Sequence, residues 1–185
     1  MTVFVGLGSN LGERAANLRK ALVLLRGSGH FRVGKTSSFY ETEPVGPPQP
    51  LFLNGAAEGK TDLSAEAFLT LLKETEKAAG RKQTERWGPR EIDLDLLFYG
   101  DSVLSTDELT VPHPRMQERE FVLTPLAEIA PEFRHPRLHK TNLELLERLY
   151  FHGDPQKPLS DAVLESVGPS PGRDDRFRPD DGGAS

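Results

Sequence analysis

The segment 91–99 constrains the fold of this chain more than any other, because two kinds of side chain alternate along it. Isoleucine or leucine occupies every second position at its start, and aspartate stands between them. Successive side chains of a β-strand point to opposite faces, so this period of two predicts a strand. Such a strand fits a sheet with an apolar core on one face. The apolar side consists of Ile92, Leu94 and Leu96, and the acidic side of Asp93 and Asp95.

Apolar residues recur at helical spacing in four other segments. The first predicted helix begins at Asn10 or at the Gly12-Glu13 pair and ends at Gly27. Ser64 is a suitable N-cap for a second helix over 64–79, which Gly80 would end. Two further helices are predicted at 121–129, broken at Pro125, and at 141–150.

Segments rich in β-branched and aromatic residues predict additional strands at 2–7, 31–43 and 51–60, with a short edge strand at 110–112. Strands and helices then follow one another as β-α-β-β-α-β. This order is typical of an α+β fold. We therefore predict a ferredoxin-like sandwich, in which helices cover an antiparallel sheet.

The composition places these elements in one domain. We assign residues 1–158 to it and 159–185 to a tail rich in proline, glycine and aspartate, which we expect to be mobile. The absence of cysteine excludes disulfides and thiolate metal sites. The start lacks a signal peptide, and no apolar run reaches the roughly 18 residues of a membrane span. We therefore expect a cytoplasmic protein that does not bind membranes, and a monomer. The net charge of −5 argues against a broad nucleic-acid-binding surface.

The glycine-rich segment 6–12 has the spacing G-x-G-x-x-x-G. This is one residue longer than the dinucleotide-binding fingerprint, and no Gly-Lys-Ser/Thr follows it, so neither a Rossmann loop nor a P-loop is indicated. The segment predicts a tight turn from strand to helix.

Asp93 and Asp95 are the strongest candidates for chemistry. Their Cα atoms would lie about 6.5–7 Å apart on one face of a strand. Two carboxylates on a half-buried surface repel each other, and a hard cation such as Mg²⁺ resolves that repulsion. The alternative is that both aspartates pair with Arg86, Arg90 or Arg119 on a solvated sheet face.

Basic residues are dense immediately before the acidic strand. The segment 81–90 contains three arginines, one lysine and the only tryptophan of the chain, Trp87. Guanidinium groups bind phosphate oxygens in two-pronged fashion, so this composition is expected where phosphates meet metal. His113, held between two prolines, either donates to a phosphate or caps a neighbouring segment.

Several of these segments, taken in order, resemble the 6-hydroxymethyl-7,8-dihydropterin pyrophosphokinase family over about residues 2–150. The block R-W-G-P-R-E-I-D-L-D at 86–95 is the most specific part of the resemblance. The other matching segments are 6–12, S-F-Y-E-T-E-P at 38–44, F-L-N at 52–54, 109–121, and P-L-A-E-I-A-P at 125–131.

The resemblance implies transfer of pyrophosphate from ATP to the hydroxymethyl group of the pterin, with release of AMP, in folate biosynthesis. Two Mg²⁺ ions would be held by Asp93 and Asp95, and Arg81 and Arg90 would join them as catalytic residues. The implied pterin-binding residues are Thr42, Pro44, Val45, Phe52, Asn54 and Phe121. The implied ATP-binding residues are Glu76, Trp87, Arg90, Leu96, His113 and Arg119.

Three positions depart from the family pattern. Gln83 stands where many relatives have arginine, Glu108 where some have arginine, and Pro114 where a tyrosine can follow the histidine. They bear on nucleotide grip and on the closure of a loop around 81–87, which the resemblance implies. Two alternatives of other kinds stay open. One is a non-catalytic RNA-recognition module on the same scaffold, and the other is a metal-dependent nucleotidyltransferase with a different acceptor.

Overall fold

The computed structural model describes residues 1–82 and 88–151. The predicted tail at 159–185 and the domain boundary at 158 lie outside the described residues, as do Gln83 and Trp87. Within the described ranges, each helix is too short or too polar to cross a lipid bilayer.

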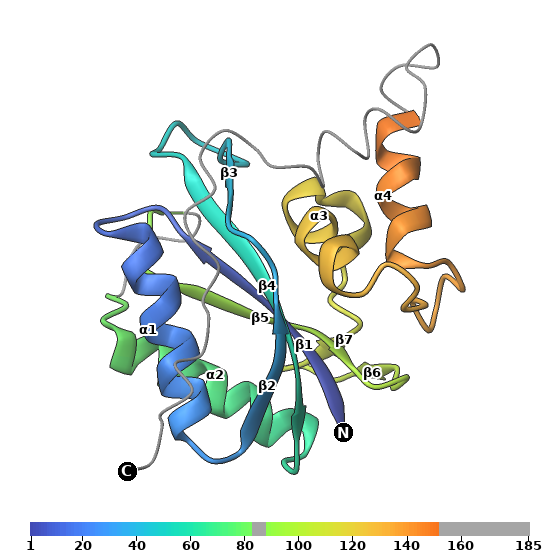
Figure 1. Cartoon of the computed structure of the whole chain (residues 1–185), viewed down its shortest axis with the longest axis horizontal. Coiled ribbons are helices and arrows are strands. Elements are labelled where there is room, and N and C mark those ends of the chain that lie inside the picture. The colour runs from blue at the N-terminus through green and yellow to red at the C-terminus, as the bar shows by residue number, and fades with distance from the viewer. Residues whose placement is uncertain (83–87, 152–185) are drawn as a thin grey trace, which may run out of the picture.

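A five-stranded antiparallel sheet forms the centre of the molecule, as predicted (Figure 1). The strands follow the order β2-β4-β1-β5, and β3 pairs with β4 beyond the end of β2. Strand β1 therefore lies between β4 and the acidic strand β5. The strands are β1 (Thr2–Ser9), β2 (Phe31–Thr36), β3 (Tyr40–Thr42), β4 (Phe52–Thr61) and β5 (Asp93–Tyr99).

Helices cover both faces of this sheet (Figure 1). Helices α1 (Arg14–Gly27) and α2 (Ala65–Ala79) pack on one face, and α3 (Glu120–Ile129) and α4 (Asn142–Phe151) on the other. Alternate residues of β1 enter the two cores: Val3 and Val5 face α1 and α2, whereas Phe4 faces α3 and α4. The sequence prediction of an α+β sandwich is confirmed.

The predicted ends of α1 and α2 are largely confirmed. Helix α1 begins after Glu13, so the Gly12-Glu13 alternative is right and Asn10 is not the cap. In α2, the Ser64 side chain accepts a hydrogen bond from the backbone N–H of Ala67 at 3.2 Å. Gly80 ends this helix with a left-handed φ of 111°, which favours glycine.

The predicted single strand 31–43 is wrong, because it divides into β2 and β3. Thr36 pairs with Ala57 and Tyr40 with Asn54, so four steps along this segment match three along β4. The Ser37 side chain accepts the N–H of Ala56 at 2.9 Å and takes over a hydrogen bond of the ladder. A local side-chain bond of this kind interrupts the strand.

Two smaller predictions also need correction. The strand β7 (Thr110–Val111) pairs with β6 (Leu104–Ser105) in a separate hairpin, because Thr106 N–H donates to the Leu109 carbonyl at 2.8 Å and closes the turn. Helix α3 is not broken at Pro125 but runs through it. The one backbone hydrogen bond that proline cannot donate is offset by packing, since α3 is buried between the sheet and α4. The 3₁₀ helix η1 (Met116–Glu118) precedes α3.

Candidate active site

A cavity of about 390 Å³ opens on the face of the sheet that carries α3. Its volume is in the range of small-molecule sites. Strands β1, β4 and β5 form its floor, while Lys73 of α2, Arg81 just after that helix, the segment 113–119 and the start of α3 form its walls. Most predicted site residues line it: Thr42, Val45, Phe52, Asn54, Arg81, Arg90, Asp93, Asp95, His113, Arg119 and Phe121.

Glycines keep the floor of the cavity free of side chains. Gly8 lies in β1 between Asn54 of β4 and Asp93 of β5. A Cβ atom at Gly8 would stand 3.0 Å from Asn54 Oδ1. The predicted first strand, 2–7, includes Gly6 and is confirmed, but it continues to Ser9, so the predicted turn is wrong for Gly8 and holds for Gly12, where φ is 65°. Glycine inside a strand commonly marks the close approach of a ligand.

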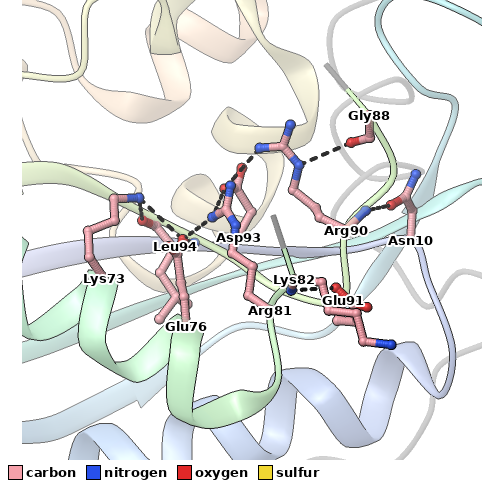
Figure 2. Close-up of polar contacts among 10 residues, drawn as sticks. All are labelled: Asn10, Lys73, Glu76, Arg81, Lys82, Gly88, Arg90, Glu91, Asp93 and Leu94. Atoms are coloured by element: carbon pink, nitrogen blue, oxygen red, sulfur yellow. Dashed lines mark hydrogen bonds and ion pairs between the residues drawn. The ribbon is translucent and has the colours of Figure 1, made fainter. Parts of the chain in front are cut away.

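Asp93 is held by two guanidinium groups (Figure 2). Its Oδ1 atom lies 2.8 Å from Arg81 and 3.1 Å from Arg90. Burial by itself would raise the pKa of Asp93, but the charges of Arg90 and Arg81 outweigh it and hold the pKa below its ordinary value. Asp93 is therefore ionised at neutral pH. Both contacts fall on the same oxygen.

Asp95 differs from Asp93 in its surroundings. Its carboxylate forms no hydrogen bond or ion pair with the residues at 1–82 and 88–151. Burial raises the pKa of Asp95, and the neighbouring charge of Asp93 raises it further. The alternative of arginine pairing is thus right for Asp93, through Arg90, and wrong for Asp95 as far as the described residues show. Arg86 lies outside them.

The two carboxylates suit a hard divalent cation. They project from one face of β5, and one of them, Asp95, forms no ion pair in the described part of the chain. In that part, no group of three or more histidine, aspartate or glutamate side chains could hold a metal ion. Mg²⁺ commonly takes one or two protein carboxylates and completes its shell with waters and substrate phosphates. The donor set therefore fits Mg²⁺ bound together with a phosphate ligand.

Glu76 lies beneath the charged wall and does not line the cavity. Its side chain is buried, and its Oε1 atom accepts hydrogen bonds from the Leu94 N–H at 2.7 Å and from Lys73 at 3.2 Å (Figure 2). Arg81 lies 2.5 Å from the same oxygen. Burial raises the pKa of Glu76, which these cations oppose. In this structure Glu76 anchors two cations that reach the cavity.

Cations outnumber carboxylates in the cavity wall. Burial lowers the pKa of His113, so this ring is mostly neutral at pH 7. Lys73 and Arg115 were missed by the sequence analysis, and Arg115 could have been found because it follows the His113 motif directly. The described cations are Lys73, Arg81, Arg90, Arg115 and Arg119, against Glu43, Asp93 and Asp95. The excess of positive charge suits a polyanionic ligand.

Another part of the cavity lining is aromatic and carries an amide. Asn54 donates through Nδ2 to the Thr42 hydroxyl at 2.7 Å, and the two rings of Phe52 and Phe121 lie in the same wall. The Arg119 guanidinium stands 5.7 Å from the centre of the Phe121 ring. Arg119 thereby joins the aromatic wall to the cationic wall.

Three of the predicted residues that the structure describes do not line this cavity. Leu96 is 3% exposed and lies in the core on the side of α1 and α2, as its place in the strand alternation requires. Pro44 and Glu76 are absent from the lining, although Glu43 and Val45 flank Pro44 and line the cavity. Trp87 lies outside the described residues.

Asn10 is a supporting residue that the sequence analysis missed in this role. Its Oδ1 accepts the Arg90 N–H at 2.7 Å, and its Nδ2 donates to Gln49 at 3.0 Å. Asn10 thereby fixes the backbone of Arg90, whose side chain reaches Asp93.

Comparison with known proteins gives consistent matches. Residues 4–131 match the family described as 7,8-dihydro-6-hydroxymethylpterin-pyrophosphokinase. A 2-amino-4-hydroxy-6-hydroxymethyldihydropteridine pyrophosphokinase of Synechocystis is 46% identical over 145 residues, which is 78% of this chain and 74% of the relative. The corresponding protein of Bacillus subtilis is 48% identical over 130 residues, or 70% of this chain and 78% of the relative.

Longer proteins contain a similar unit. A folate synthesis bifunctional protein of Arabidopsis thaliana is 47% identical over 69% of this chain, which spans 23% of that protein. The solved structure of Plasmodium falciparum HPPK-DHPS has the same fold, with a TM-score of 0.62 at 16% identity, over 84% of this chain and 44% of that one. The match over residues 4–131, together with relatives nearly half identical over most of their length, shows that this chain belongs to the 7,8-dihydro-6-hydroxymethylpterin-pyrophosphokinase (HPPK) family.

Proposed function

We propose that the chain transfers the pyrophosphoryl group of ATP to the hydroxymethyl group of 6-hydroxymethyl-7,8-dihydropterin in a Mg²⁺-dependent reaction. Pyrophosphokinase activity in folate biosynthesis belongs to the family as a whole. The observation that carries the finer proposal is the Asp93–Asp95 pair, which lies between a cationic wall and an aromatic wall of one cavity.

The aromatic wall is suited to a reduced pterin. A flat heterocycle can stack against the rings of Phe52 and Phe121. The Asn54 side chain offers a donor and an acceptor, and its bond to Thr42 fixes the orientation of the amide. An aminopyrimidinone edge requires this pair of complementary groups. The open floor at Gly8 leaves room for the ring beside Asn54.

The cationic wall is suited to the triphosphate. Arg81 and Arg90 bond to Asp93, and Arg119 and His113 line the same cavity. Guanidinium groups bind phosphate oxygens through paired hydrogen bonds, which orient the chain of phosphates and balance its charge. In the proposed complex these side chains exchange part of their contact with Asp93 for phosphate oxygens.

Asp93 and Asp95 would hold the Mg²⁺ ions, two of which are expected. The bound ions would neutralise phosphate charge and keep the donor and acceptor oxygens in line. The pterin hydroxyl oxygen forms a bond to the β-phosphorus, the bond from that phosphorus to the α-bridging oxygen breaks, and AMP leaves while the hydroxyl proton is released. Positioning carries the reaction, so the chain needs no covalent nucleophile.

The decisive experiment replaces Asp95. We expect Asp95→Ala and Asp95→Asn to lower AMP formation from ATP and the pterin by about 10³-fold or more. The apparent melting temperature should stay the same or rise slightly, because a buried like charge is removed. Asp101→Ala is the matched control, since Asp101 is an exposed aspartate just after β5. Wild-type turnover by the Asp95 variants, measured by AMP release at saturating Mg²⁺, would refute the assignment.

A further inference from the structure

Glu128 of α3 makes an unusual set of contacts away from the cavity. Its Oε2 atom accepts hydrogen bonds from the Ser38 N–H at 2.8 Å and from the Tyr40 hydroxyl at 2.7 Å. Its Oε1 atom accepts from the Ser38 hydroxyl at 3.0 Å. One carboxylate therefore joins α3 to the segment that leads into β3. Glu128 itself does not line the cavity.

These contacts lie where the sheet is interrupted. Between β2 and β3, Ser37 bonds with the backbone of Ala56 through both its N–H and its hydroxyl oxygen, each at 2.9 Å. The next N–H, that of Ser38, points instead to Glu128. A buried or half-buried backbone donor needs a partner, and Glu128 provides it in place of a neighbouring strand. The helix thus completes the hydrogen bonding of this strand edge.

The elements on both sides of the contact lead into the cavity. Tyr40 and Thr42 are two positions apart on β3, so their side chains share one face of the strand. Glu128 and Phe121 are seven positions apart on α3, which is about two turns and roughly 10 Å along one helix face. Thr42 and Phe121 both line the pterin end. The hydrogen bond between Glu128 and Tyr40 therefore helps to set the distance between Phe121 and Thr42.

We propose that Glu128 is a positioning residue for the pterin half of the site: its bonds to Ser38 and Tyr40 set the spacing between Phe121 and the Thr42–Asn54 pair. The inference rests on the proposed function, because it assigns the aromatic wall to the pterin. It predicts a selective effect, since Lys73 lies in α2 and the two guanidinium groups that bond to Asp93 belong to Arg81 and Arg90, none of which Glu128 hydrogen-bonds.

The shape of the carboxylate is required for this role, and its charge is not. A glutamine at 128 can place its carbonyl oxygen where Oε2 accepts two donors. Its NH₂ group can then donate to the Ser38 hydroxyl, which also has acceptor lone pairs. All three contacts are preserved in this arrangement. Glu128→Gln should therefore rescue what Glu128→Ala loses.

The chain offers a matched control. At the other end of α3, Glu120 accepts a hydrogen bond from the Tyr150 hydroxyl of α4 at 2.5 Å. Tyr40→Phe and Tyr150→Phe each delete one phenolic hydroxyl bonded to a glutamate of α3. Only Tyr40→Phe removes a contact between α3 and β3. If the effect came from a general weakening of α3, both variants would show it.

The experiment measures the KM for the pterin and for ATP, kcat and the melting temperature of the full chain. We expect Glu128→Ala to raise the pterin KM about tenfold and Tyr40→Phe about threefold, with the ATP KM within twofold of wild type. Glu128→Gln and Tyr150→Phe should stay within twofold for both substrates.

Equal changes in the two KM values, or the same effect from Tyr40→Phe and Tyr150→Phe, would overturn the inference. If Glu128→Ala does not fold, the two tyrosine variants still decide. Failure of the proposed function has a different signature, because the wild-type chain itself would then neither bind nor consume the pterin.

Discussion

The two halves of the cavity are assembled in different ways. Most of the charged half is drawn from a short stretch of chain, Lys73 to Asp95, in which α2 leads into β5 and cations bond to carboxylates (Figure 2). His113, Arg115 and Arg119 complete it from the segment before α3. The aromatic half combines β3, β4 and α3, and its members range from Thr42 to Phe121. The charged half therefore depends mainly on local sequence and strand register. The aromatic half depends on how helix α3 packs on its face of the sheet.

This difference makes a functional prediction. The halves meet at the glycine floor of β1, and few side chains belong to both. Substitutions inside one half should change the affinity or KM for one substrate and leave that for the other substrate nearly the same. A variant in one half that changes the KM values for both substrates equally would contradict this separation of the two halves.

The largest expected effect on the affinity for one substrate is that of Asn54→Leu. This change preserves side-chain volume but removes both hydrogen-bonding groups from the pterin end and frees the Thr42 hydroxyl. A site that hydrogen-bonds its ligand loses much of its affinity when a buried polar group is left without a partner. We expect pterin affinity to fall about 100-fold, near 3 kcal/mol. Calorimetry with pterin and with an ATP analogue checks this result, and an equal loss for the nucleotide would contradict it.

A smaller effect, on ATP in place of the pterin, is expected from Lys73→Met. The variant retains an apolar stem of similar length but removes a half-exposed ammonium from the cationic wall. Glu76 keeps its bonds to Arg81 and to the Leu94 N–H, so the fold should be retained. We expect the ATP KM to rise about fivefold, near 1 kcal/mol.

The matched control for Lys73 is Lys77→Met in the same helix, because Lys77 does not line the cavity. The pterin KM should remain within twofold of wild type in both variants. A rise in the ATP KM that is as large for Lys77→Met would show that the charge of α2, and not the position of Lys73, is responsible.

The sequence predicts the charged half better than the aromatic half, for physical reasons. Asp93 and Asp95 are recognisable because a strand with period two puts them on one face beside an apolar partner set. The same period places Leu96 in the core, although the family resemblance implies a contact with ATP there. Lys73 gave no signal, since a lysine among alternating charges on a helix has the pattern of a solvated surface.

Most of the fold was predictable because its signals are local, such as the Ser64 cap and the left-handed Gly80. The errors arose where another part of the chain decides the outcome. Ser37 interrupts a strand through its bond to Ala56, and Pro125 stays helical because α3 is packed on two sides. The role of Gly8 in the floor also depends on its two neighbouring strands. None of these partners is close in sequence.

The smallest expected effect tests a group remote from both halves. His135 is buried against Phe98, and its Nδ1 accepts the backbone N–H groups of Arg137 and Leu138 at 3.2 and 3.3 Å. Burial lowers the pKa of His135 below its ordinary value of 6.5, and the charge of Arg137 contributes. Between the folded and unfolded pKa values, the unfolded chain binds the proton more readily, so stability is lost as the pH falls below about 6.5.

An Asn at this position can accept the same two N–H groups through Oδ1 and does not titrate. Between pH 7.5 and 5.5, the free energy of unfolding of the wild type should therefore fall by about 0.5–1 kcal/mol more than that of His135→Asn. Urea unfolding at the two pH values measures the difference. Both KM values should be unchanged at pH 7.5, which separates the stability of the α3 and α4 layer from the geometry of the cavity. Identical pH dependence of the two proteins would show that His135 titrates alike in the folded and unfolded states.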